Sequence, residues 1–288
     1  MPLFGVHESI AGGFDQAVFQ AASKGFKTLQ IFSKNSNRWS AKPIPTEIAE
    51  KFRGSLQKAG IVNPIIHDSY LINAASPNEE LRAKSVNALV DELNRADLLG
   101  ISGVVMHPGA YTTGTEESGL RLVADSLDQA FREAANSARI LLETTAGQGT
   151  CLGARFEHLA RIIDLSNYPE RLGVCLDTCH IFAAGYEFRT EETYEKMMTE
   201  FDTVIGIDRL KAIHLNDSVK GCGSRVDRHA AIGYGAIGKE TFGFLVNDPR
   251  LTGLPMILET PKGEVEIDGK TEDWDDVNLR TLRSLVRV

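Results

Sequence analysis

Six short apolar runs in this sequence each end in a histidine, an aspartate or a glutamate. The residues at these ends are His67, His107, Glu143, Asp177, His214 and Glu259. Short apolar runs bounded by polar residues are typical of buried β-strands. A carboxylate or imidazole at the end of such a strand can take part in a site at the strand's edge. What the protein can do therefore depends on whether these side chains converge.

Two further segments add donors of the same kind. His180 follows Asp177 by three residues, and Asp227 and His229 are two apart, so in extended chain they point the same way. The full set is five imidazoles and four carboxylates with no thiolate. Such a mixed set suits Zn²⁺, Mn²⁺ or Fe²⁺ better than Mg²⁺ or Ca²⁺, which prefer oxygen alone. Because a catalytic zinc takes about three protein ligands, nine donors fit about three ions with bridging carboxylates.

A cluster of divalent ions favours chemistry at phosphorus. It lowers the pKa of a bound water and stabilises both the attacking and the leaving oxygen of an in-line displacement. The formal net charge of −8 by itself argues against a polyanionic substrate. Bound divalent ions would offset most of that charge and concentrate positive charge in one cleft. Nucleic acid therefore stays among the substrate classes.

The elements that must position these donors alternate regularly along the chain. We expect strands at residues 4–7, 27–33, 63–67, 103–107, 139–143, 172–177, 210–214 and 255–259. We expect helices at residues 14–24, 46–60, 76–100, 117–138, 156–165, 191–204, 241–246 and 276–286. Ser76 and Pro77 have the spacing of a helix cap and first turn. Strands separated by helices run parallel, so the sequence predicts a (β/α)₈ TIM barrel with its site at the C-terminal mouth.

Composition fits one domain of this kind over residues 1–288. Hydrophobic residues make up 42% and charged residues 24% of the chain, which is ordinary for a globular protein with a full core. The first residues do not have the pattern of a secretory signal, and no apolar run is long enough to span a membrane. The four cysteines form no CxxC pair and are interpreted as reduced thiols, which predicts a cytoplasmic protein.

Two other histidines are interpreted differently. His158 falls within an expected helix and is assigned a structural role. His7 also ends an expected strand, and a supporting or packing role is at least as consistent with its position as ligation.

Several longer motifs carry a family resemblance. They are HESIAGG at 7–13, HDSYLIN at 67–73, ETTAGQG at 143–149, CLDTCH at 175–180, HLND at 214–217, GSRVDRH at 223–229, IGYG at 232–235 and LETP at 258–261. Through them the sequence resembles endonuclease IV, the zinc-dependent apurinic/apyrimidinic endonucleases of DNA base excision repair. The resemblance extends over nearly the whole chain.

The resemblance implies a trinuclear zinc site, in which Mn²⁺ or Fe²⁺ may substitute. One ion would be held by His67, His107 and Glu143, the second by Glu143, Asp177, His214 and Glu259, and the third by His180, Asp227 and His229. The implied reaction is hydrolysis of the phosphodiester 5′ to an abasic site in duplex DNA, leaving a 3′-hydroxyl. Glu143 would be the catalytic residue, because it could also orient or deprotonate the attacking water. The resemblance further implies a monomer.

The resemblance also implies residues that contact DNA. Tyr70 and Leu71 would wedge into the base stack while the damaged nucleotide turns out, at a cost that is smallest at a damaged site. The expected phosphate contacts are Lys34, Arg38 and Arg228. The family usually has an arginine in the loop after the second strand, where this chain has Asn37 with Arg38 beside it.

A second class of enzyme fits part of the pattern. Metal-dependent sugar isomerases and epimerases use a related barrel with histidine and carboxylate ligands. They generally need one or two ions and do not need the Asp227 and His229 pair. A count of bound metal separates the two classes.

Overall fold

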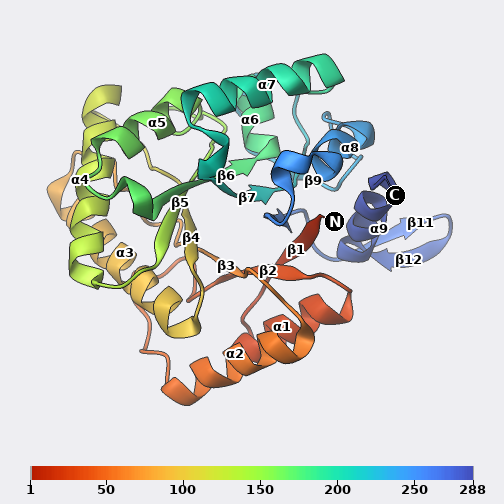
Figure 1. The fold of residues 1–288 in the computed structure, drawn as a ribbon, viewed down its shortest axis with the longest axis horizontal. Coiled ribbons are helices and arrows are strands. Elements are labelled where there is room, and N and C mark those ends of the chain that lie inside the picture. The colour runs from red at the N-terminus through yellow and green to blue at the C-terminus, as the bar shows by residue number, and fades with distance from the viewer. Residues whose placement is uncertain (1, 288) are drawn as a thin grey trace.

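The computed structural model describes residues 2–287, and eight parallel strands form a closed barrel at its centre (Figure 1). The barrel strands are β1 (Leu3–Glu8), β2 (Thr28–Phe32), β3 (Ile65–His67), β4 (Gly103–Met106), β5 (Arg139–Glu143), β6 (Leu172–Asp177), β7 (Leu210–His214) and β10 (Pro255–Leu258). They follow one another around the barrel in sequence order, and β10 closes the ring against β1. The TIM-barrel fold expected from the sequence is confirmed.

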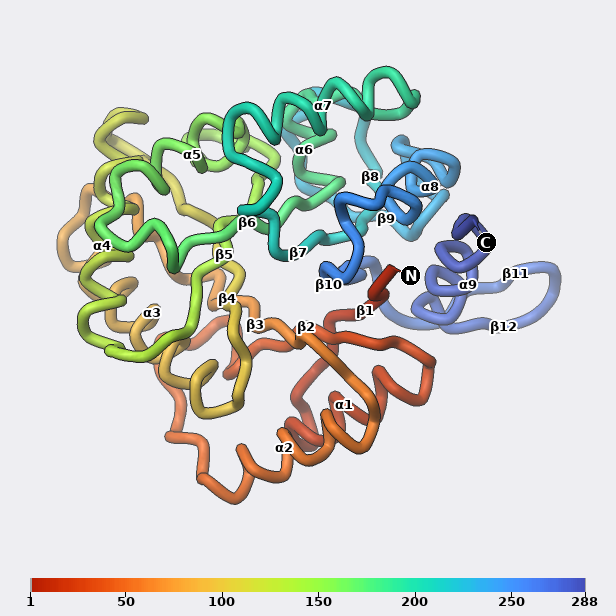
Figure 2. Tube along the Cα trace, viewed as in Figure 1, coloured from red at the N-terminus to blue at the C-terminus, as the bar shows by residue number. Residues whose placement is uncertain are grey.

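Helices surround the strands on the outside of the barrel, as the trace in Figure 2 shows. They are α1 (Phe14–Ser23), α2 (Thr46–Ala59), α3 (Glu79–Leu99), α4 (Glu116–Ala134), α5 (Phe156–Leu165), α7 (Glu191–Val204), α8 (Lys239–Asn247) and α9 (Trp274–Leu285). Single 3₁₀ turns at Pro169–Arg171, Ile207–Arg209 and Pro249–Leu251 lead into β6, β7 and the approach to β10. Because every crossover passes through helical structure, all C-terminal strand ends meet at one mouth.

Three features depart from the regular alternation. A short helix, α6 (Thr178–Ala184), follows β6 directly, and a small ribbon joins β8 (Asp217–Ser218) to β9 (His229–Ala230). A hairpin of β11 (Glu264–Ile267) and β12 (Lys270–Asp273) precedes α9 and lies at the edge of the molecule in Figure 1. Each of the three is too short to give a recognisable pattern of apolar residues, so none was predicted from the sequence.

The start of α3 differs from the expected one. Asn78, not Ser76, caps this helix, and its side chain accepts a hydrogen bond from the backbone N–H of Leu81. Ser76 instead accepts from the N–H of Asn78, so Pro77 lies just before the helix rather than in its first turn. Both arrangements use a polar side chain shortly before a free N–H, and the sequence offers the two side by side.

The barrel interior is filled by one apolar side chain from each of six strands. These residues are Ile65, Val105, Leu141, Cys175, Ala212 and Ile257. Space there is tight: a Cβ on Gly173 of β6 would lie 2.7 Å from the side chain of Lys211 and 2.9 Å from that of Leu141. A glycine at this position therefore lets the neighbouring strands approach. The second and larger apolar layer lies between the strands and the helices.

Within residues 2–287, no helix combines the length and the apolar character needed to cross a membrane.

Candidate metal centre

Strand periodicity places the candidate ligands. Side chains two residues apart on a strand point to the same face. Each strand-end ligand follows one of the six interior residues by two positions: His67 follows Ile65, and Glu143 follows Leu141. The same step gives His107, Asp177, His214 and Glu259. The side chains that the sequence singled out are therefore the next inward layer, directly above the packed interior.

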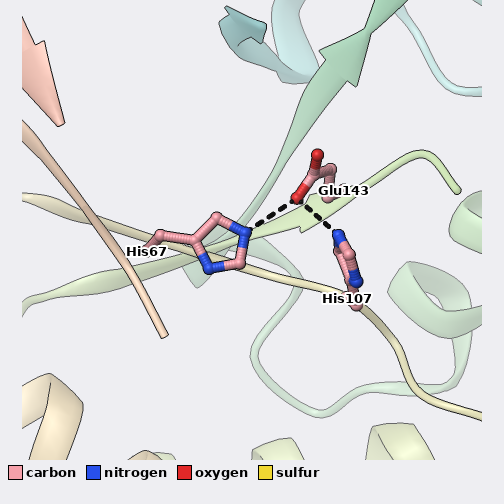
Figure 3. A group of neighbouring side chains, drawn as sticks. All are labelled: His67, His107 and Glu143. Carbon is pink, nitrogen blue, oxygen red and sulfur yellow. Dashed lines mark hydrogen bonds and ion pairs between the residues drawn. The ribbon is translucent and has the colours of Figure 1, made fainter. Parts of the chain in front are cut away.

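The first group consists of His67, His107 and Glu143, which lie on or just after β3, β4 and β5. Figure 3 shows both imidazoles directed at one oxygen of the glutamate. The Nε2 atoms of His67 and His107 each lie 3.1 Å from Glu143 Oε2. Glu143 is fully buried, whereas the side chain of His107 is 35% exposed and borders the open cleft.

The second group consists of Glu143, Asp177, His214 and Glu259. His214 Nδ1 lies 2.9 Å from Glu143 Oε1, 3.0 Å from Glu259 Oε2 and 3.7 Å from Asp177 Oδ2. Glu143 thus directs Oε2 to the first group and Oε1 to the second. A carboxylate in this position can bridge two metal ions.

A register shift brings two members of the second group level with each other. The pairing of β6 with β7 slips between Val174 and Cys175, after which Asp177 lies opposite His214. β-bulges of this kind re-aim side chains and are common next to active sites. Without the shift, Asp177 would lie opposite Ile213 instead of His214.

The third group consists of His180, Asp227 and His229, and it is built differently. His180 lies on α6, Asp227 lies in the loop before β9, and His229 is the first residue of β9. His180 Nε2 is 3.2 Å from Asp227 Oδ2, and His229 Nε2 is 3.3 Å from Asp227 Oδ1. His229 Nε2 is also 3.7 Å from Asp177 Oδ2, so the third group adjoins the second.

Close contact between carboxylates and imidazoles shifts their pKa values in opposite directions. Burial disfavours a charged Glu143, but His214 and His107 outweigh burial and hold the pKa of this carboxyl well below its usual value. Burial likewise disfavours a cationic His180, but Asp177 and Asp227 outweigh it and keep its pKa well above the ordinary value. The pKa values of Glu259 and Asp227 are lowered as well, so these carboxylates favour a nearby positive charge.

The donor set fits a metal ion. In the second group three carboxylates and one imidazole place ligand atoms within 4.8 Å of one another, and most of these side chains are fully buried. Buried charges of one sign are costly unless a counter-charge is present. A divalent cation supplies that charge, and imidazole with carboxylate is the donor combination of zinc sites. The first and third groups have the same ligand-atom spacing.

Two polar residues around the centre were not singled out from the sequence. Asn216 donates to Asp177 Oδ2 at 2.7 Å and accepts from the backbone N–H of Glu259 at 2.8 Å. Gln30 lies on β2 in contact with His214 and Glu259. An amide carries no charge, so neither was assigned a role, although Asn216 falls within the HLND motif at 214–217.

One cysteine also lies within reach of a metal. Cys179 groups with Asp177 and His229, with ligand atoms within 4.8 Å of one another. Burial raises the pKa of its thiol to about 12, which keeps it protonated. Because the thiolate is the form that ligates metal, Cys179 is a poor ligand in this setting.

The remaining histidines lie as their sequence positions suggest. His7 Nδ1 is 2.8 Å from the side-chain nitrogen of Gln30 and 3.4 Å from Glu259 Oε1, beside the centre rather than within a ligand group. His158 is buried in α5 and accepts from the backbone N–H of Gly153 at 3.1 Å. His158 is therefore structural.

Lys34 is placed differently from the phosphate contact expected of it. Its side chain is only 1% exposed, and its ammonium pairs with Glu92 and, at 2.9 Å, with Asp91 of α3. Ser33 donates to the same Glu92 at 2.5 Å. A lysine buried against two carboxylates anchors the loop after β2 to the barrel wall and does not reach a phosphate.

The other expected DNA contacts lie at the mouth of the barrel. Tyr70 is 61% exposed, and its ring packs edge-on against Phe32 at 5.4 Å. Leu71 is partly exposed beside it, and Arg38 and Arg228 are exposed. A cleft of ≈ 250 Å³ opens here and is lined by residues that include Tyr70, His67, His107, His180 and Asp227. The first and third groups therefore face a cavity that a ligand can enter.

Together, these features define a class: a parallel (β/α)₈ barrel with adjoining histidine–carboxylate groups of metal-ligand type at its C-terminal mouth. Residues 18–285 match the family model for the xylose isomerase-like TIM barrel. The chain is 53% identical to the probable endonuclease 4 of Chloroflexus aggregans, over 100% of this chain and 99% of the relative. It is 47% identical to the probable endonuclease 4 of Citrifermentans bemidjiense, with 99% of each chain covered.

A solved structure gives the same result. The crystal structure of endonuclease IV from Thermus thermophilus superposes with a TM-score of 0.86 at 39% identity, covering 99% of this chain and 98% of that one. The chain therefore belongs to the endonuclease IV family. A D-tagatose 3-epimerase-like protein matches with a TM-score of 0.68 at 20% identity, which shows a shared barrel fold and nothing more.

Proposed function

We propose that this chain is a zinc-dependent apurinic/apyrimidinic endonuclease of DNA repair. It hydrolyses the phosphodiester 5′ to an abasic site in duplex DNA and leaves a 3′-hydroxyl. One observation carries the proposal: three groups of ligand-type donors adjoin one another at the mouth of the barrel, and Glu143 belongs to two of them. The names of its endonuclease 4 relatives support the same activity.

Each group of donors would hold one zinc ion. The first, second and third groups have three, four and three potential ligands, with Glu143 shared between the first two. Zinc bound there would supply a Lewis acid for the phosphate oxygens and lower the pKa of a water. Mn²⁺ and Fe²⁺ suit the same donors.

Glu143 is the residue that we assign as catalytic. It is fully buried, and its low pKa keeps it an anion. Its two oxygens face different groups, so it sets the spacing between the first and second. An ionised carboxylate held in this way can orient a nearby water or accept its proton.

Recognition of the lesion is assigned to the exposed rim. Tyr70 and Leu71 stand beside the cleft, where an aromatic and an aliphatic side chain can enter a gap in the base stack. Arg38 and Arg228 are exposed and available to phosphates. Lys34 is left out of this set because it is buried and ion-paired.

The remaining expectations are proposed with the function. We infer that residues 1–288 act as one catalytic domain, that the protein is a monomer, and that it works in the cytoplasm on DNA. The net charge of −8 disfavours DNA binding, and cations bound at the centre would offset most of it, so we expect binding to depend on metal.

A nicking assay beside elemental analysis tests the proposal. The substrate is a duplex with one tetrahydrofuran abasic analogue, and a duplex without the lesion is the control. We expect about three zinc ions per chain, a single cut 5′ to the lesion, and loss of cutting after chelation. An intact duplex in the presence of a fully zinc-loaded protein would contradict the proposal. One exchangeable Mn²⁺ with turnover of a ketose would instead identify a sugar isomerase or epimerase.

A further inference from the structure

Four of the five ligand histidines make a hydrogen bond through their second ring nitrogen. In His67 and His180, Nδ1 meets the backbone carbonyls of Asp68 and Thr144 at 3.0 and 2.8 Å, and in His229 it meets that of Glu259 at 3.2 Å. A carbonyl accepts only, so Nδ1 keeps its proton and Nε2 is the nitrogen that can give up a proton and bind metal. His214 is reversed. Its Nδ1 faces the second group, and its Nε2 meets a side chain, Oε1 of Gln30, at 2.8 Å.

Gln30 is well placed to control this orientation. It is fully buried on β2, and it pairs with the inward-facing Ile65 of β3, so its side chain points into the barrel. Its amide nitrogen donates to Glu259 Oε1 at 2.6 Å and lies 2.8 Å from His7 Nδ1. All the hydrogen-bonding capacity of the amide nitrogen is thus used within the centre.

The amide can take one orientation only. Ionised Glu259 has acceptors and no donor, so the NH₂ of Gln30 must face it. The carbonyl oxygen must then face His214 and accept a hydrogen bond from the Nε2–H group. That leaves the lone pair of Nδ1 directed at the point where the oxygens of Glu143 and Glu259 lie 2.9 and 3.0 Å away. One uncharged side chain therefore fixes two of the four donors of the second group.

We propose that Gln30 is a positioning residue of the second metal group. It selects the tautomer in which His214 Nδ1 can bind metal, and it holds the carboxylate of Glu259 at the same time. This inference rests on the proposed metal site. Partners that orient ligands in this way typically change metal affinity by about 10–100-fold when removed.

Substitution of Gln30 tests the proposal with a readout other than catalysis. Q30M keeps the length of the side chain and removes its polar atoms. The matched control is T28V, which removes a buried hydrogen bond of the same strand, from Thr28 to the carbonyl of Asn63, nearer the other end of the barrel. Zinc affinity is measured by competition with a chromophoric chelator. Q30M should lower the affinity for one zinc ion by about 10–100-fold and leave the affinity for the other ions unchanged. T28V should bind all of them like the parent.

A second readout follows the proton itself. In the zinc-loaded parent the imidazole N–H of His214 is buried against Gln30, so its NMR signal should be protected from exchange with water. Q30M should lose that protection. Q30E should keep the signal and still lose zinc affinity, because it retains the acceptor for His214 but not the donor for Glu259. Q30E thus provides the test if Q30M does not fold.

The outcomes separate this inference from the proposed function. A parent protein that binds no zinc overturns both. A parent that binds about three zinc ions, together with a Q30M protein of unchanged affinity and unchanged N–H protection, overturns the role of Gln30 alone. Equal losses in Q30M and T28V would show general destabilisation of β2 and would also overturn it.

Discussion

The second and third groups present the same kinds of donor on two different supports. Donors of the second group come from strand ends, and Asp177, His214 and Glu259 are 0%, 0% and 13% exposed. Two donors of the third group come from β9 and the loop before it, where Asp227 and His229 are 35% and 18% exposed. The barrel therefore fixes one group, whereas the other depends on how well a surface segment is anchored.

That anchor can be identified. The loop before Asp227 is tied to α6 by two backbone hydrogen bonds, from Gly223 to the carbonyl of Phe182 and from Arg225 to that of Ala183. On the other side of β9, the buried carboxylate of Asp217 accepts from five backbone N–H groups, those of Ser218, Gly233, Gly235, Ile237 and Gly238. The third group thus owes its geometry to the hydrogen bonds of one loop and a two-stranded ribbon. The second owes its geometry to the closure of the sheet.

The largest effect should come from the residue that the first and second groups share. Glu143→Gln removes the anion from both, so we expect cleavage of an abasic duplex to fall by at least about 10³-fold, with loss of zinc from these two groups. The fold should survive, because the amide has the same shape. Zinc content, circular dichroism and nicking rate measure the three effects.

The exposed substitution Glu133→Gln on α4 is the matched control and should behave as the parent. If Glu143→Gln cut DNA near the parental rate, the shared carboxylate would not be part of the reaction.

Removal of zinc by a chelator should occur at different rates from the second and third groups. Because two of its three donors, Asp227 and His229, are partly exposed and lie outside the barrel strands, the third group should release zinc before the second. We expect excess EDTA to give a fast phase with about one third of the zinc, followed by a slow phase. His229→Asn should abolish the fast phase alone. A single phase in the parent would mean that the two supports hold metal equally well.

Weakening the hydrogen bonds of Asp217 should lower the stability of the protein and speed the release of zinc from the third group. Asp217→Asn replaces an acceptor of five N–H groups by an amide whose NH₂ must face some of them. We expect the free energy of unfolding in urea to fall by about 1.5–3 kcal/mol and the fast phase of zinc release to become faster. The exposed Asp125→Asn on α4 is the control. An unchanged slow phase would show that the barrel-borne group is independent of this loop.

The difference between strand ends and loops also explains how much of the site could be predicted from the sequence. The barrel and the strand-end ligands follow from period-2 patterns, because a residue two positions beyond a buried one must share its face. Asp227 and His229 were found through their spacing and the family resemblance, since a loop has no period. Gln30 and Asn216 were missed because uncharged amides resemble any other polar residue. Lys34 was misplaced because its partners Asp91 and Glu92 lie on a helix distant in sequence.

The smallest effect should come from the rim, where no donor is involved. Tyr70 contacts Phe32 and His67 through its ring, with centroids 5.4 and 5.6 Å apart, and leaves most of its surface exposed. Tyr70→Ala should weaken binding to abasic duplex by about 1–3 kcal/mol, the range of one aromatic stacking contact. Zinc content should stay at the parental value.

Tyr70→Phe is the control that isolates the ring from the hydroxyl. It should bind abasic duplex like the parent, because stacking and wedging need only the aromatic face. Fluorescence anisotropy with abasic and undamaged duplexes measures both variants, and the loss in Tyr70→Ala should be confined to the abasic duplex. If Tyr70→Ala instead loses zinc in parallel with DNA affinity, the ring acts by packing on His67, and the rim is part of the metal centre rather than a separate reader of the lesion.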